Sequence, residues 1–143
     1  MIKRLSILCM LLLALCTLTF VSCSDDDDDG ESNSSASIVG TWVCVEKDGN
    51  YTHTSTATFN ADKTFLAIEE DTGESATYKI KGTYSVDGST LSVTVTDLVD
   101  PYEYKDEEWH KVPAESTTTR FEIKGDKLYL LDGESGTVVY TKK

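Results

Sequence analysis

Few side chains of this sequence have the type and spacing that catalysis or metal binding requires. Its two histidines, His53 and His110, lie far apart, and neither has a second ligand at a spacing typical of zinc sites. DEEWH places acidic residues beside His110, but short acidic runs in loops are usually solvated. Ser135 in GESG follows a turn motif and lacks the strand-to-helix elbow of a hydrolase nucleophile. We therefore expect no enzyme activity, no metal and no cofactor.

One cysteine, Cys23, has a recognisable covalent chemistry. It ends a segment in which the basic pair KR precedes an uncharged run from Leu5 to Val21, which is typical of a signal peptide. FVSC resembles the bacterial lipobox, with Phe20 in place of the usual Leu. The resemblance implies that the leader, residues 1–22, is removed and that palmitate-type acyl chains anchor Cys23 to a membrane, since two or three chains bind stably. The alternative is an uncleaved anchor, because the run from Leu5 to Val21 has 17 residues. Spanning helices need about 17–25 residues.

The remaining cysteines predict a fold without disulfides. Cys9 and Cys16 leave with the leader and Cys23 carries lipid, so only Cys44 stays free. Cys44 has no basic neighbour that would lower its pKa, and we expect it to be a small core residue. The 121 residues left after processing are enough for one self-sufficient core.

The charge of the chain is strongly negative. The formal net charge is -12, and loss of the two basic residues of the leader makes it -14. Such a surface repels phosphate backbones, so we exclude nucleic acid as a partner. Residues 23–37 carry the polar run SDDDDDGESNSSAS, which predicts a disordered tether. CSDDDD resembles a lipoprotein export signal of some Gram-negative lineages. This implies an outer-membrane lipoprotein displayed on the cell surface, with retention at the periplasmic face as the alternative.

From Ile38 onward the hydrophobic pattern has a period of two. In TYKIKGTYSV, Tyr78, Ile80, Tyr84 and Val86 share one face, as in a half-buried strand. Turn motifs, several with Asp-Gly, separate eight candidate strands. They cover residues 38–46, 52–60, 63–70, 75–86, 89–97, 115–124, 127–132 and 136–142. We predict an all-β, eight-stranded antiparallel up-and-down barrel, because closure removes exposed edges. An open β-sandwich is the alternative.

The connection over residues 97–115 is longer than the others. Loops beyond about 12–15 residues are usually functional or disordered. Its aromatic residues Tyr102, Tyr104 and Trp109 favour contact with a protein or surface partner. The alternative is a lid or strand extension that packs these aromatics over one end of the barrel.

Several segments resemble the small lipocalin-like domains of bacterial lipoproteins: IVGTWVCVE, TATFNADKTF, GTYSVDGSTLSV and GDKLYLLD. The most specific is Gly40-x-Trp42, which is similar to the Gly-x-Trp motif of lipocalins. The resemblance implies a lipocalin-like barrel over residues 38–143 in which Trp42 closes one end, covered by a basic residue such as Arg120 or Lys142. The Thr-Asp-Tyr element of longer lipocalins is missing.

Two functions are compatible with such a barrel, because eight strands enclose either packed side chains or one small ligand. The first is a lipid-anchored lipoprotein that binds a small hydrophobic molecule. The second is a non-enzymatic interaction or scaffold lipoprotein with a filled barrel, which binds a protein or surface partner through residues 97–115. The bulky residues expected in the interior are Trp42, Phe59, Phe65, Tyr78, Tyr84, Phe121 and Tyr140.

Overall fold

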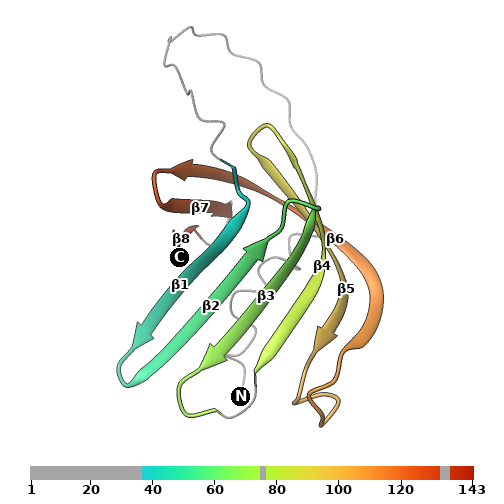
Figure 1. Cartoon of the computed structure of the whole chain (residues 1–143). Coiled ribbons are helices and arrows are strands. Elements are labelled where there is room, and N and C mark those ends of the chain that lie inside the picture. Colours follow the sequence, from blue (N-terminus) through green and yellow to red (C-terminus); the bar gives the residue numbers. More distant parts are fainter. Residues whose placement is uncertain (1–36, 75–76, 133–135) are drawn as a thin grey trace, which may run out of the picture.

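The computed structural model describes residues 37–74, 77–132 and 136–143. Its strands are β1 (Gly40–Asp48), β2 (Tyr51–Phe59), β3 (Thr64–Asp71), β4 (Tyr78–Asp87), β5 (Thr90–Val99), β6 (His110–Lys124), β7 (Lys127–Asp132) and β8 (Gly136–Lys142). Each strand pairs antiparallel with the next and β8 pairs with β1, which closes a barrel (Figure 1). The predicted up-and-down barrel is confirmed, and the open sandwich is wrong.

The predicted leader, the lipidated Cys23 and nearly all of the acidic tether lie outside the described residues. Within the part of the chain that the structure does describe, no helix is long and apolar enough to cross a membrane.

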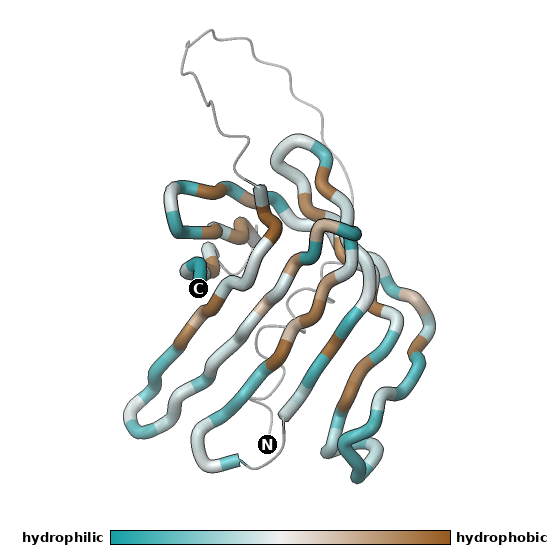
Figure 2. The backbone as a smooth tube through the Cα atoms, viewed as in Figure 1, coloured by the Kyte–Doolittle hydropathy of each residue, from teal (hydrophilic) through white to brown (hydrophobic). Residues whose placement is uncertain are grey.

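The barrel forms because apolar and polar residues alternate along its strands (Figure 2). In β1, Trp42 and Cys44 face inward and are 0% and 8% exposed, whereas the next residue, Val45, faces outward and is 52% exposed. The other strands contribute inward residues in the same way, and these side chains form one core cluster inside the barrel. Its most deeply buried members, each at most 2% exposed, include Trp42, Leu91 and Leu128.

The connection between β5 and β6 is shorter than the sequence predicts. β5 continues to Val99 and β6 begins at His110, so the connecting loop covers residues 100–109 and the predicted range 97–115 is wrong. Pairing continues past an irregularity, where the register shifts between Val95 and Asp97, and it resumes with Asp97 opposite Lys111 and Leu98 opposite His110. Proline and polar residues in HKVPAE indicate a loop, but a strand accepts both next to a bulge.

The backbones of β4 and β5 approach each other closely at Gly82. The β4–β5 register shifts between Lys81 and Gly82. A Cβ on Gly82 would lie 1.9 Å from the backbone oxygen of Thr94, so only glycine fits at this position.

The barrel is closed more completely toward one end than toward the other. β8 pairs with β1 at Trp42 and Val43, and β7 pairs with β6 over residues 120–124. Among the described ladders, residues 44–48 of β1 therefore pair only with β2, and residues 110–119 of β6 only with β5. We call the end that holds Trp42 and the β2–β3 turn the Trp42 end, and the end that holds loop 100–109 the loop end. Figure 1 shows β7 and β8 lying toward the Trp42 end.

Candidate ligand-binding cavity

The Trp42 end of the interior is plugged. The indole of Trp42 is fully buried, and its Nε1 donates a hydrogen bond of 2.7 Å to the carbonyl of Ile38. The Lys142 Nζ lies 5.3 Å from the centre of the indole ring, so Lys142 and not Arg120 is the basic residue that covers it. Gly40 has a φ of +136°, and a Cβ there would lie 3.1 Å from Cε of Lys142. Glycine thus leaves room for the lysine stem.

An aromatic cluster packs inside the β2–β3 turn. The ring centroids of Phe59 and Phe65 are 6.3 Å apart, and Tyr84 meets Phe59 edge to face at 5.0 Å. The Tyr84 hydroxyl donates a 2.7 Å hydrogen bond to the carbonyl of Asn60, and burial raises the pKa of Tyr84. Its polar end is therefore satisfied, and the cluster presents rings toward the barrel interior.

Beyond these rings the barrel contains a cavity. The centre of a water molecule can occupy about 60 Å³ of it. Its apolar lining residues are Ala57, Phe59, Phe65, Ala67, Ile80, Leu91, Val93, Val95, Leu128 and Leu130. Ala57 and Ala67 lie opposite each other in the β2–β3 ladder, and their small side chains leave this space open. On a scale of about 10–15 Å³ per water, the cavity would hold roughly four to six waters, or a single ring or short aliphatic chain of similar bulk.

The polar groups of the lining lie on two sides of the cavity. Ser55 Oγ and the Tyr140 hydroxyl, both buried, are 3.1 Å apart and hydrogen-bonded. Burial raises the pKa of Tyr140 to about 12, which keeps this hydroxyl neutral. Glu115, Thr117 and Thr119 line the cavity from β6, along the stretch that pairs only with β5 among the described strands. The cavity is thus least enclosed along β6.

The residues predicted to surround a ligand occupy three kinds of position. Phe59, Phe65 and Tyr140 line the cavity. Trp42 and Tyr84 are buried core residues outside the lining, and Tyr78 and Phe121 pack partly buried against the core. Their part in binding stays a prediction. The site prediction does not include Ala57, although its inward spacing in YTHTSTATF follows the same period of two.

Toward the loop end the inward faces of β2 and β3 become polar. His53 lies opposite Asp71 in the ladder, with Nδ1 and Oδ1 2.6 Å apart, and Glu69 is the next inward residue of β3. Among the described residues, His53 Nε2 and Glu69 Oε1 are buried without a hydrogen-bond partner. Burial raises the pKa of the Glu69 carboxyl, an effect that nearby His53 opposes and Asp71 strengthens. From the sequence, His53 is considered only as a zinc ligand, and its contact with Asp71 is not predicted.

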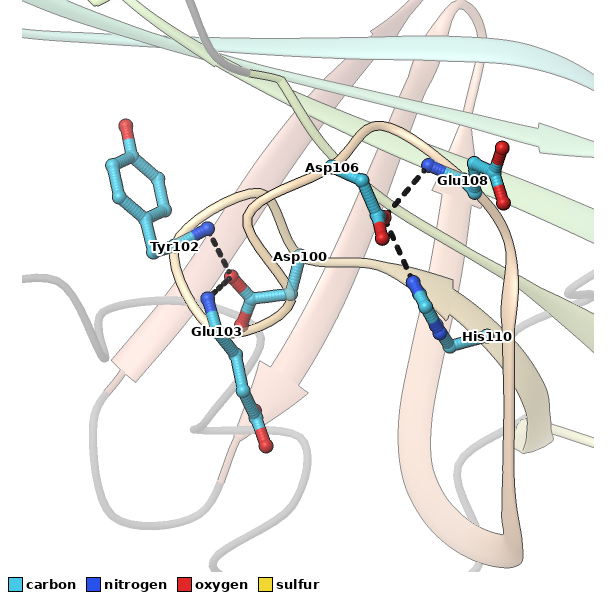
Figure 3. A network of polar contacts seen from close by, with 6 residues as sticks. All are labelled: Asp100, Tyr102, Glu103, Asp106, Glu108 and His110. Carbon is cyan, nitrogen blue, oxygen red and sulfur yellow. Dashed lines mark hydrogen bonds and ion pairs between the residues drawn. The ribbon is translucent and has the colours of Figure 1, made fainter.

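Loop 100–109 folds around two aspartates (Figure 3). Asp100 Oδ1 accepts hydrogen bonds from the backbone amides two and three residues later, at 2.9 and 3.0 Å. Asp106 Oδ1 accepts from the amide of Glu108 at 3.1 Å and lies 2.8 Å from His110 Nε2. The hydrogen bond with His110 lowers the pKa of the Asp106 carboxyl. The acidic residues of the loop therefore organise its backbone.

The aromatic residues predicted to bind a partner lie on this loop and remain partly exposed. Tyr102, Tyr104 and Trp109 are 46%, 37% and 39% exposed. Tyr104 stacks on the His110 ring with centroids 3.8 Å apart, and Lys81 Nζ lies 4.2 Å from the centre of the Trp109 ring. None of the three lines the cavity. Their role in partner binding stays a prediction.

Across residues 37–74, 77–132 and 136–143, no three His, Cys, Asp or Glu side chains are placed to hold a metal ion together.

An eight-stranded barrel with a tryptophan plug at one end and an apolar cavity has the architecture of a lipocalin-type domain. Residues 38–111 match the lipocalin-like domain family, and this chain belongs to that family. The match begins just before β1 and extends to the first residues of β6. A comparison with curated proteins gives no match.

Proposed function

We propose that the protein binds a small hydrophobic molecule inside the barrel and has no catalytic activity. The apolar cavity between Ala57 and Ala67 is the observation that carries this proposal. Burial of a methylene group is worth about 0.8 kcal/mol, so a six-carbon chain would gain about 5 kcal/mol. Before the cost of association is subtracted and any polar contact is added, this gain corresponds to a dissociation constant somewhat below about 1 mM.

A cavity-filling substitution tests the proposal. An environment-sensitive apolar dye should bind the full-length chain with increased fluorescence, and Ala67→Phe should abolish binding because the new ring occupies the cavity. Ala67→Leu fills it with less strain and should weaken binding in the same direction. Ile68→Phe, on the opposite face of β3, is the matched control and should leave the affinity within about twofold. Unchanged dye affinity in a folded Ala67→Phe variant would contradict internal binding.

We further propose that acyl chains on Cys23 hold the protein at the outer membrane and that residues 23–37 tether it on the cell surface. FVSC and the acidic run that follows it support this anchor. A Cys23→Ser variant should leave the membrane fraction, whereas Cys44→Ser should remain there. Retention of Cys23→Ser in that fraction after its leader is removed would contradict lipid anchoring. Protease treatment of intact cells should degrade the parent protein, and protection from protease would place it at the periplasmic face.

The second candidate function is binding of a protein or surface partner through loop 100–109. It is favoured by the partial exposure of Tyr102 and Trp109 on a loop that Asp100 and Asp106 hold in shape. A photo-crosslinker at Tyr102 should then capture one defined partner in cells, and Trp109→Ala should abolish capture without changing dye binding. A crosslinker at Val86, on the β4–β5 hairpin at the Trp42 end, is the control.

A further inference from the structure

Two polar residues with incomplete hydrogen bonds, His53 and Glu69, lie one inward position beyond the lining of the cavity. Ser55, Ala57 and Phe59 of β2 line the cavity, and His53 is the next inward residue toward the loop end. Phe65 and Ala67 of β3 line it too, and Glu69 is the next inward residue of that strand. His53 and Glu69 are therefore the next inward layer beyond the lining, on the side of Ser55. Glu69 lies opposite Ser55 in the β2–β3 ladder, and Ser55 lines the cavity and is hydrogen-bonded to Tyr140.

The two unpaired atoms are both acceptors when the imidazole of His53 is neutral. Asp71 as a carboxylate only accepts, so the hydrogen in its 2.6 Å contact belongs to His53 Nδ1. In the neutral imidazole, Nε2 then carries a lone pair, and Glu69 Oε1 is a second acceptor. Both atoms are buried and have no partner among the described residues. A buried acceptor without a donor is costly enough that a native structure usually supplies one, either as water or as a ligand.

The charge around these two acceptors is negative. Glu46 of β1 lies opposite His53, and Glu69 and Asp71 lie beside it on β3. Glu115 lines the cavity from β6, and no Lys or Arg is among the described residues of the lining. A carboxylate head group would meet this surface as a like charge. A group with several N–H donors and a positive charge would satisfy both acceptors and offset the buried charge of Glu69.

We propose that His53 and Glu69 form a head-group site for a primary ammonium group, and that the ligand of the barrel is a small amphipathic amine whose apolar part occupies the cavity. This inference rests on the proposed function, because the head-group site adds to binding in the cavity. The ammonium group donates to Glu69 Oε1 and to His53 Nε2, while Asp71 fixes the orientation of the imidazole.

Three six-carbon ligands with different head groups test this site. Hexylamine, hexanol and hexanoate each compete with the apolar dye for binding to the protein. The protein is used as it is purified from cells that express the full-length chain. Hexylamine should displace the dye at about a tenfold lower concentration than hexanol, and hexanoate should be the weakest. Glu69→Gln should weaken hexylamine by about tenfold and leave hexanol within about twofold. Glu70→Gln, which removes the same charge from the exposed face of β3, is the matched control and should change neither.

The possible failures of the two proposals are distinct. Equal affinity for hexylamine and hexanol would mean that water satisfies the two acceptors, and tighter binding of hexanoate would mean that the charge argument is wrong; either result overturns the ammonium site while the cavity proposal stands. An equal loss of hexylamine affinity in Glu69→Gln and Glu70→Gln would assign the preference to overall charge and would also overturn it. If neither dye nor hexanol binds, both proposals fail.

Discussion

Replacement of Glu69 by glutamine should make the protein more stable at neutral pH. Glu69 places a partly buried carboxylate inside the barrel, and its Oε1 has no hydrogen-bond partner among the described residues. An unsatisfied buried polar atom typically costs about 1–3 kcal/mol, and a charge adds to that cost. Because the side chain keeps some exposure and His53 lies nearby, we expect the free energy of unfolding to rise by about 1–2 kcal/mol in Glu69→Gln.

The pH dependence of this gain has a definite sign. Burial raises the pKa of Glu69 in the folded state above its ordinary value of 4.5. The protonated acid is thus favoured by folding, so the associated stability is complete below about pH 4.5 and is lost as the pH rises through the higher folded-state pKa. The difference between Glu69→Gln and the parent should be small at pH 4 and should reach its full value near pH 8.

Urea denaturation of the full-length chain at these two pH values measures the difference, with the fluorescence of buried Trp42 as one probe. Glu70→Gln is the control and should stay within about 0.5 kcal/mol of the parent, as expected for an exposed surface substitution. A destabilised Glu69→Gln variant at pH 8, or a difference that does not change with pH, would refute the reasoning. Such a result would mean that Glu69 makes a stabilising interaction in the unliganded protein.

Three further substitutions probe the frame around the cavity. Gly82→Ala should lower the unfolding free energy by more than about 3 kcal/mol in urea denaturation, because its Cβ would lie 1.9 Å from the Thr94 oxygen; a loss below about 1 kcal/mol would show that β5 shifts freely. Tyr140→Phe should cost about 1 kcal/mol at pH 7. The parent should then lose about 2–3 kcal/mol of unfolding free energy as the pH rises from 10 through the Tyr140 pKa of about 12. In alkaline urea titrations Tyr140→Phe should therefore become more stable than the parent. Parallel pH dependences of the two proteins would contradict the raised pKa. Lys142→Met should lower the thermal midpoint by an amount equivalent to about 0.5–1 kcal/mol through loss of its contact with Trp42, and an unchanged midpoint would assign no stability to that contact.

The strands could be predicted because each carries its own local pattern. The alternation in TYKIKGTYSV and the Asp-Gly turns depend on neighbouring residues only, and β4 and the β4–β5 hairpin follow from them. The place of Trp42 follows from the Gly-x-Trp motif. The extent of β6 could not be predicted, because the pairing of Leu98 with His110 depends on a register shift between β5 and β6.

The cavity could not be predicted from the bulky residues alone. Its space depends on Ala57 and Ala67 meeting across the β2–β3 ladder, and that meeting depends on register. The polar end has the same origin. His53 and Asp71 are 18 positions apart in the sequence and become neighbours only because β2 and β3 pair in this register. A period of two places each residue on the inward face, but it does not reveal which partner lies opposite.

The short seam between β1 and β8 gives the protein a built-in chemical reporter. Cys44 is the one cysteine within the described residues, is 8% exposed, and lies immediately after Val43, where the β1–β8 pairing ends. Burial also raises the pKa of its thiol, so a thiol reagent should react slowly until the two strands separate. The rate of Cys44 alkylation then reports how often β1 and β8 separate by local unfolding. A molecule that holds the barrel shut from within should slow that rate in proportion to its occupancy.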